Sequence, residues 1–298
     1  MSEPFVFIQD NFVPASQASI LISDLSIQRG YGIFDFFKTL GGKPVFLEDH
    51  LDRFFHSARQ LRLETGKTRD ELRGILTVLQ QKNKIPDSGI RLTLTGGYSP
   101  DGYSLASPNL IITQQPLATT ITGELQKGIR LVTYPHQRQM PEVKTIDYLM
   151  AIWLQPFIRE NAADDVLYHR GGISHQDGIN HPDGIITECP RSNFFMVTAD
   201  DTIVTPARHI LKGITRMKVL EVAGKRFRTE QRDMTLEELK TAREAFITST
   251  TKHILPVLQI DDIIIGKRSP GDVSRWLNQE LYSLAVNGMH CPPRSALR

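Results

Sequence analysis

The stretch Thr187-Glu188-Cys189-Pro190-Arg191-Ser192-Asn193-Phe194-Phe195 places one carboxylate between two apolar segments. Ile185-Ile186 precede it and Phe194-Phe195-Met196-Val197 complete it, and such flanks predict two buried strands. Glu188 is therefore expected inside a core, which is costly unless a cation pairs with it. Most glutamates are solvated surface residues, so a functional role for Glu188 needs support from other parts of the chain.

Further along, the turn Leu211-Lys212-Gly213-Ile214-Thr215-Arg216 precedes an apolar stripe at helical spacing. Backbone amides at a helix start bind anions, and the helix dipole assists them. Hydroxyl groups in Thr248-Ser249-Thr250-Thr251 and the guanidinium of Arg53 are further donors for a phosphate. Viewed singly, each of these elements is equally typical of ordinary capping residues.

Lys144 lies in Pro141-Glu142-Val143-Lys144-Thr145-Ile146-Asp147-Tyr148, a segment of mixed polarity. Most lysines are solvated, but partial burial here would favour a neutral, nucleophilic amine. One cofactor requires an amine that forms a Schiff base, a carboxylate that keeps a pyridine nitrogen protonated, and backbone donors that bind a phosphate. The three pieces together predict pyridoxal 5'-phosphate, with Lys144 as Schiff base and proton shuttle.

The chain also resembles the fold-type IV pyridoxal phosphate enzymes, which include branched-chain aminotransferase, D-amino-acid aminotransferase and aminodeoxychorismate lyase. The resemblance runs from about Ser23 to the end of the second domain. It depends on the order of these signatures: Arg29-Gly30-Tyr31-Gly32-Ile33-Phe34-Asp35, His50-Leu51-Asp52-Arg53-Phe54, Lys144 with Tyr148, Glu188 through Phe195, Thr205-Pro206, Leu211 through Arg216 and Thr248-Ser249-Thr250.

The resemblance implies roles for individual residues. Lys144 would be the Schiff-base lysine, Glu188 the partner of the pyridine nitrogen, and Tyr148 a neighbour of the phenolic oxygen of the cofactor. The phosphate would be held by Arg53, Ile214, Thr215, Ser249 and Thr250. A homodimer is implied as well, with each active site between the two domains of one chain.

Substrate choice depends on what binds the substrate carboxylate, and here the chain departs from familiar members. The loop Gly96-Gly97-Tyr98-Ser99-Pro100-Asp101-Gly102-Tyr103 lacks the Arg-x-His of the usual D-amino-acid aminotransferases, and Asp35 stands where branched-chain enzymes typically carry Glu. The candidate carboxylate ligands are Arg29, Arg191, Lys252 and Arg91. Arg29 and Arg191 are preferred, although each is equally compatible with a salt bridge or a solvated face.

An atypical D-amino-acid aminotransferase working by a ping-pong mechanism on amino acids and 2-oxo acids is the first expectation. A branched-chain L-amino-acid aminotransferase is the close alternative. Aminodeoxychorismate lyase comes next, and a non-catalytic protein that stores pyridoxal phosphate comes last.

At 298 residues the chain exceeds one ordinary domain. We expect an N-terminal α/β domain at 1–116, an interdomain linker at 117–125, a C-terminal cofactor-binding domain at 126–288 and a loose tail at 289–298. The fold class is α+β. The resemblance implies a smaller N-terminal α/β sandwich and a larger, strand-rich C-terminal pseudo-barrel with surrounding helices.

Periodicity predicts individual elements. A strand-like alternation runs from Phe5 to Val13, one helix covers about 47–63, and a capping box at Thr68 opens another. Strands at 90–95 and 109–113 are expected to form a hairpin with a long loop. The second domain should contain strands at 129–133, 166–168, 194–198, 245–248 and 255–260, with helices after Thr145, Thr215 and Thr235.

Composition excludes several classes of protein. Lys plus Arg number 35 and Asp plus Glu 33, so the formal charge of +2 gives no footprint for nucleic acid or an anionic membrane. The two cysteines, Cys189 and Cys291, and the lack of a leader at Met1 favour a reducing cytoplasm. The paired motifs His175-Gln176-Asp177-Gly178 and His181-Pro182-Asp183-Gly184 are interpreted as turns, and no metal site is predicted.

Overall fold

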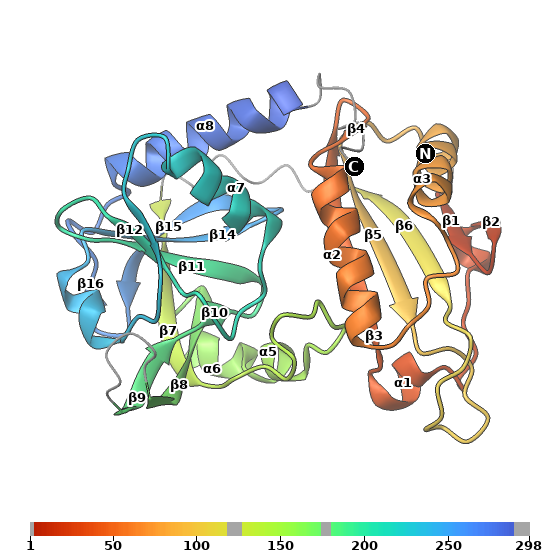
Figure 1. The fold of residues 1–298 in the computed structure, drawn as a ribbon, viewed down its shortest axis with the longest axis horizontal. Coiled ribbons are helices and arrows are strands. Elements are labelled where there is room, and N and C mark those ends of the chain that lie inside the picture. Colours follow the sequence, from red (N-terminus) through yellow and green to blue (C-terminus); the bar gives the residue numbers. More distant parts are fainter. Residues whose placement is uncertain (1–2, 118–126, 174–179, 289–298) are drawn as a thin grey trace, which may run out of the picture. The chain divides into compact units, whose positions relative to one another are not determined.

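The computed structural model describes residues 3–117, 127–173 and 180–288 (Figure 1). The chain forms two compact units. Unit 1 comprises Met1–Ala118, Val143–Asp147 and Leu284–Arg298, and unit 2 comprises Thr119–Glu142 and Tyr148–Ser283. Of the expected linker only Leu117 is described, and the expected tail at 289–298 lies outside the described residues. Lys144 belongs by its packing to unit 1, although the sequence on either side belongs to unit 2.

Unit 1 is built on a six-stranded sheet in the order β2-β1-β6-β5-β3-β4. The strands are β1 (Phe5–Ile8), β2 (Asn11–Pro14), β3 (Gly32–Leu40), β4 (Lys43–Pro44), β5 (Ser88–Thr95) and β6 (Leu110–Pro116). The alternation from Phe5 to Val13 is broken because Gln9 and Asp10 adopt positive φ and turn the chain into a hairpin. The expected hairpin of β5 and β6 is confirmed, since the two strands pair antiparallel.

Two helices cover one face of this sheet (Figure 1). They are α2 (Leu47–Gln60) and α3 (Arg69–Asn83), and the capping box that opens α3 is present between Thr68 and Glu71. The core lies between helices and sheet, where Phe54 and Leu76 pack with Phe37. The short η1 (Ala15–Gln17) and α1 (Leu25–Arg29) precede β3.

The alternation of β3 decides which side chains face the helices and which face away. Ile33 and Phe37 point into the core beneath the helices. Phe34, Phe36 and Lys38 alternate with them and therefore lie on the opposite face of the strand. This second face matters for function because Lys144 lies against it.

Unit 2 contains a ten-stranded sheet in the order β13-β12-β11-β14-β15-β7-β8-β9, with β10 paired to β11 and β16 to β15. Its core lies around Phe194, Met196 and Ile247, whose side chains are fully buried. The strands are β7 (Ile129–Pro135), β8 (Asp165–Ile173), β9 (Asn180–Ile186), β10 (Glu188–Cys189), β11 (Ser192–Val197), β12 (Ile203–Thr205), β13 (Thr229–Gln231), β14 (Glu244–Ser249), β15 (His253–Ile260) and β16 (Ile263–Ile264).

The helices of unit 2 are α5 (Leu149–Trp153), α6 (Gln155–Glu160), α7 (Ile214–Ala223) and α8 (Asp272–Gly288), of which the part of α8 from Leu284 onward belongs to unit 1. The expected helices after Thr145 and Thr215 are confirmed. The helix expected after Thr235 is only the 3-10 helix η2 (Glu237–Thr241), because Ala242 is already extended. No helix in the described part of the chain is long and apolar enough to cross a membrane.

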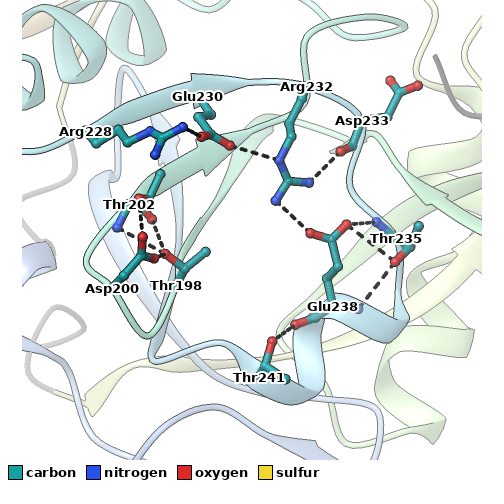
Figure 2. A network of polar contacts seen from close by, with 10 residues as sticks. All are labelled: Thr198, Asp200, Thr202, Arg228, Glu230, Arg232, Asp233, Thr235, Glu238 and Thr241. Atoms are coloured by element: carbon teal, nitrogen blue, oxygen red, sulfur yellow. Dashed lines mark hydrogen bonds and ion pairs between the residues drawn. The ribbon is translucent and has the colours of Figure 1, made fainter. Parts of the chain in front are cut away.

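A polar network fixes the irregular chain between β13 and η2 (Figure 2). The guanidinium of Arg232 donates to Glu230 at 3.1 Å and to the backbone oxygen of Asp233 at 2.8 Å, and forms an ion pair with Glu238 at 2.7 Å. These contacts hold Met234, whose backbone oxygen accepts from the amide of Ile186 at 2.7 Å. The network therefore supports the strand that leads to Glu188.

Candidate active site

The segment that carries Lys144 pairs with the beginning of β3. The backbone oxygen of Lys144 accepts from the amide of Phe34 at 2.9 Å, and the amide of Ile146 donates to Gly32 at 3.1 Å. A Cβ at Gly32 would lie 2.8 Å from the oxygen of Leu94 and 3.1 Å from the side chain of Ile146. The glycine is therefore required where the Lys144 segment pairs with the beginning of β3.

The aromatic ring of Phe34 lies beneath two cations. The Nζ of Lys144 is 4.5 Å from the ring centroid, and the Cζ of Arg91 is 3.8 Å from the same centroid. Both distances fall within the range of cation–π attraction. The half-buried amine of Lys144 and the guanidinium of Arg91 are thus brought to one aromatic surface of unit 1.

On the other face of β3, Asp35 forms a buried cluster with two residues of α2. Its Oδ2 accepts from Nε of Arg53 and its Oδ1 from Nη2, both at 2.8 Å, while Nδ1 of His50 lies 2.7 Å from Oδ1. Nη1 of Arg53 has no acceptor within the described part of the chain. One edge of the guanidinium is therefore fixed, and the group retains donors for an anion.

The cluster has a defined charge state. Burial raises the pKa of Asp35, but the charges and hydrogen bonds of Arg53 and His50 outweigh it and hold that pKa well below its usual range. Burial lowers the pKa of His50 despite the nearby carboxylate. We infer a neutral His50 that donates through Nδ1–H, beside an ion pair of Asp35 and Arg53.

In unit 2, Glu188 is buried, as its flanks predict, and both of its carboxylate oxygens are engaged. Oε1 accepts from Nε of Arg138 at 2.8 Å, and Oε2 accepts from the amide of Leu211 at 2.9 Å. Arg138 also donates to the backbone oxygen of Pro141. Arg138 therefore supplies a counter-charge to Glu188 within the protein, in addition to the pyridine nitrogen that the sequence led us to expect.

The turn before α7 is held by Glu188 and by its cross-strand neighbour. Asn193 lies directly opposite Glu188 in the pairing of β10 with β11, and its Nδ2 donates to the oxygen of Leu211 at 2.7 Å. A Cβ on Gly213 would lie 2.2 Å from Oδ1 of Asn193, so any larger residue there requires Asn193 to move. Hydrogen bonds from Leu211 to Glu188 and from Asn193 to Leu211 therefore connect the buried carboxylate to the start of α7.

The chemistry around this helix start fits an anion. Gly213 is the N-cap of α7 and contributes no side-chain acceptor to the first amides. Thr248 lies opposite Asn193 on the same face of the sheet, and its buried Oγ1 has no hydrogen-bond partner among the described residues. A helix start without a side-chain cap and an unsatisfied hydroxyl beside it form the donor set that a phosphate group requires.

The remaining predicted residues lie in varied environments. Ser249 accepts from the amide of Lys252 at 3.1 Å, and Lys252 forms an ion pair with the buried Asp165 at 3.4 Å. Ile214 and Thr215 are the first residues of α7, and Thr250 follows β14 in a turn. Tyr148 precedes α5. Arg29 ends α1 and donates to the oxygen of Gln28, and Arg191 is exposed between β10 and β11.

Sequence reasoning missed Arg138, which pairs with Glu188. Its only sequence signal was an arginine six residues before Lys144, and a lone arginine predicts nothing in particular. The bonds from Asp35 to His50 and Arg53 were also missed, although all three residues occur in the recognised signatures. In the described part of the chain no group of three potential ligands could hold a metal, and most of the 175–183 segment lies outside that part.

Comparison with known proteins identifies the class to which this fold and these residues belong. The family described as amino-transferase class IV matches residues 32–260. The chain therefore belongs to the class IV aminotransferase family and is a transaminase of the fold-type IV class. Enzymes of this class use pyridoxal phosphate.

Individual relatives are distant but cover nearly the whole chain. A D-alanine aminotransferase of Staphylococcus haemolyticus is 25% identical over 280 residues, covering 92% of this chain and 95% of that protein. A putative branched-chain-amino-acid aminotransferase of Methanocaldococcus jannaschii is 26% identical over 290 residues, covering 94% and 96%. The crystal structure of a branched-chain aminotransferase from the archaeon Thermoproteus uzoniensis with norvaline superimposes with a TM-score of 0.81 at 23% identity, covering 96% of each chain.

Proposed function

We propose that this chain is a pyridoxal phosphate-dependent aminotransferase that transfers an amino group between a D-amino acid and a 2-oxo acid. The observation that carries the cofactor assignment is the bond between Glu188 and the amide of Leu211. It joins a buried carboxylate, suited to a pyridine nitrogen, to a helix start suited to a phosphate. Lys144 supplies the amine that this chemistry requires.

The protein groups divide the work as follows. Glu188 holds a positive charge on the pyridine nitrogen, while Arg138 and Leu211 keep its carboxylate in place. The amides of Ile214 and Thr215, the hydroxyls of Ser249 and Thr250, and the free edge of Arg53 bind the phosphate. Lys144 moves the proton at the α-carbon of the substrate, and Tyr148 donates to the phenolic oxygen. The cofactor, when bound, supplies an aldehyde and an electron sink.

The preference for D-amino acids is supported by the relatives. Several relatives that cover this chain are D-alanine aminotransferases. The loop 96–103 lacks an arginine and a histidine, so a different cation must bind the carboxylate. Arg91 is the best placed candidate in unit 1, because it shares the Phe34 surface with Lys144, and Arg29 and Arg191 complete the proposed clamp.

A half-reaction panel tests the proposal. Enzyme loaded with pyridoxal phosphate is mixed with the D- and L-forms of alanine, glutamate and leucine, and the cofactor absorbance is followed. We expect conversion to the pyridoxamine form with D-alanine and D-glutamate. Conversion with L-leucine alone would establish the branched-chain alternative. Release of pyruvate from aminodeoxychorismate would establish the lyase, and bound cofactor without any conversion would indicate a storage protein.

We also propose a homodimer in a reducing compartment. Apolar side chains are strongly exposed near α1 and on α5, where Ile22 is 83% exposed and Leu149 is 73% exposed. A second copy of the chain would cover such side chains. Cys189 is compatible with a reducing compartment, because burial raises the pKa of its thiol and keeps it unreactive. Sedimentation equilibrium of the wild type and of Ile22→Asp tests the dimer, and a monomeric wild type would contradict it.

A further inference from the structure

Arg216 is a buried cation in the first turn of α7. Its side chain is 3% exposed, and its nitrogen atoms reach only uncharged acceptors. Nε donates to Oγ1 of Thr205 at 3.3 Å, and Nη2 donates to the oxygen of Pro206 and to Oε1 of Gln231, both at 2.9 Å. These partners belong to the ends of β12 and β13. The arginine therefore ties the start of α7 to two strands.

Within the described residues, the charge of Arg216 has no direct counterion. Among the described residues it forms no ion pair, and Glu188 is the carboxylate whose field acts on it. Burial lowers the pKa of Arg216 to about 10, which still leaves it charged at neutral pH, and Glu188 opposes that shift. Arg138 already neutralises Glu188 through a direct bond. A buried charge without a partner is costly, so this turn retains an excess of positive charge.

The excess charge lies where the helix dipole is also positive. Gly213 caps α7 and Arg216 is its third residue, and the Cβ of Arg216 lies 3.7 Å from the position of a Cβ on Gly213. The dipole of α7 adds positive potential at the same turn. The two contributions add, and Glu188, the carboxylate bonded to Leu211 beside this turn, is already paired with Arg138.

We propose that Arg216 is a positioning residue for the anionic group bound at residues 213–215, which it serves by fixing the first turn of α7 and by adding positive potential. This inference rests on the proposed function, in which that group is the phosphate of pyridoxal phosphate. Arg216 does not contact the phosphate itself, since its bonds lead to β12 and β13. Its effect is therefore specific for the charge of the ligand and independent of the pyridine ring.

Gln231 allows the charge to be altered without removing the arginine. Gln231→Glu places a carboxylate at the position of Oε1, keeps the hydrogen bond to Nη2 and neutralises Arg216. Gln231→Leu removes the same hydrogen bond without adding charge. Because Gln231 is exposed, both variants are expected to fold. Arg216→Lys and Arg216→Gln then compare a retained with a lost cation at the buried position.

The measurement is calorimetric titration of each apoenzyme with pyridoxal phosphate and with pyridoxal, which lacks the phosphate. We expect Gln231→Glu and Arg216→Gln to lower the preference for the phosphorylated ligand about tenfold, with little change in the affinity for pyridoxal. Gln231→Leu and Arg216→Lys should retain most of the preference. Arg275→Gln is the control, because Arg275 is exposed on α8 and forms an ion pair with Asp272 at 2.9 Å.

Equal preferences in Gln231→Glu and Gln231→Leu would overturn the electrostatic role of Arg216. A parallel loss of affinity for both ligands would reduce its role to general stability, and it would overturn the proposal in the same way. A wild-type apoenzyme that does not prefer pyridoxal phosphate over pyridoxal would instead contradict the proposed function. The two failures are therefore distinguishable in one set of titrations.

Discussion

Asp35 and Arg53 form a two-point ion pair inside unit 1, with both hydrogen bonds at 2.8 Å. The carboxylate is 1% exposed, and His50 adds a third contact at 2.7 Å. Because Arg53 cannot rotate without breaking both bonds, its free edge has one orientation. The guanidinium edge that is proposed to bind the phosphate is therefore oriented by the protein before any ligand binds.

This cluster predicts a loss of stability in mild acid. The pKa of His50 is lowered in the folded protein, chiefly by burial, so protons bind preferentially to the unfolded chain. The stability due to His50 is complete above the unfolded pKa of about 6.5 and is lost as the pH falls below it. The pKa of Asp35 is also lowered, and its contribution is lost below about pH 4.

His50→Asn tests this account, because the amide can still donate to Asp35 while the titrating ring is gone. Between pH 7 and pH 5 the free energy of unfolding should fall by about 1 kcal/mol less in the variant than in the wild type. Urea denaturation at the two pH values measures it. His56→Asn, on the same helix, is the control, and an equal effect of the two substitutions would contradict the assignment to His50.

Gly213→Ala should weaken cofactor binding. The added Cβ would lie 2.2 Å from Oδ1 of Asn193, so Asn193 must move and its bond to Leu211 is strained. We expect a loss of roughly 1–3 kcal/mol in the affinity for pyridoxal phosphate. Gly74→Ala is the matched control, since nothing lies within 4 Å of its Cβ in α3, and it should stabilise the protein slightly. Unchanged affinity in Gly213→Ala would be inconsistent with a closely packed turn.

Lys144→Ala should lower turnover by roughly a thousandfold or more, since both the covalent link and the proton transfer are lost. A competing amine exists, because burial lowers the pKa of Lys38 to about 8. Borohydride reduction of the loaded enzyme followed by peptide mass spectrometry should locate the cofactor on Lys144. Lys38→Met should keep its turnover, and a cofactor attached to Lys38 would refute the assignment.

The carboxylate clamp is tested by comparing Arg91 with Lys252. Arg91→Met should raise KM for the amino acid by about tenfold or more with a smaller change in kcat, and Arg91→Lys should lie between. Lys252→Met should lower the melting temperature more than it affects KM, because Lys252 pairs with the buried Asp165. The reverse pattern, measured by steady-state kinetics and thermal melting, would exchange the two roles.

Local patterns were sufficient for most helices and strands. The apolar stripe of α2 and the capping box of α3 describe contacts within a few residues, which the sequence contains directly. The helix expected after Thr235 was wrong, because a start signal does not say how far a helix continues. The alternation through Gln9 and Asp10 likewise concealed a turn that two positive φ angles create.

The sequence by itself determined the family, the order of the signatures, and that Glu188 is buried, since these depend on residue type and local period. The tertiary structure alone decided which partners these residues have. Arg138 meets Glu188 across 50 positions, Asp35 meets Arg53 across 18, and Lys144 joins β3 of unit 1. A hydrogen bond forms between atoms that lie within about 3 Å, however far apart their residues are in the sequence. Which residues come that close is decided by the register of the strands and by the packing of segments that are distant in the sequence.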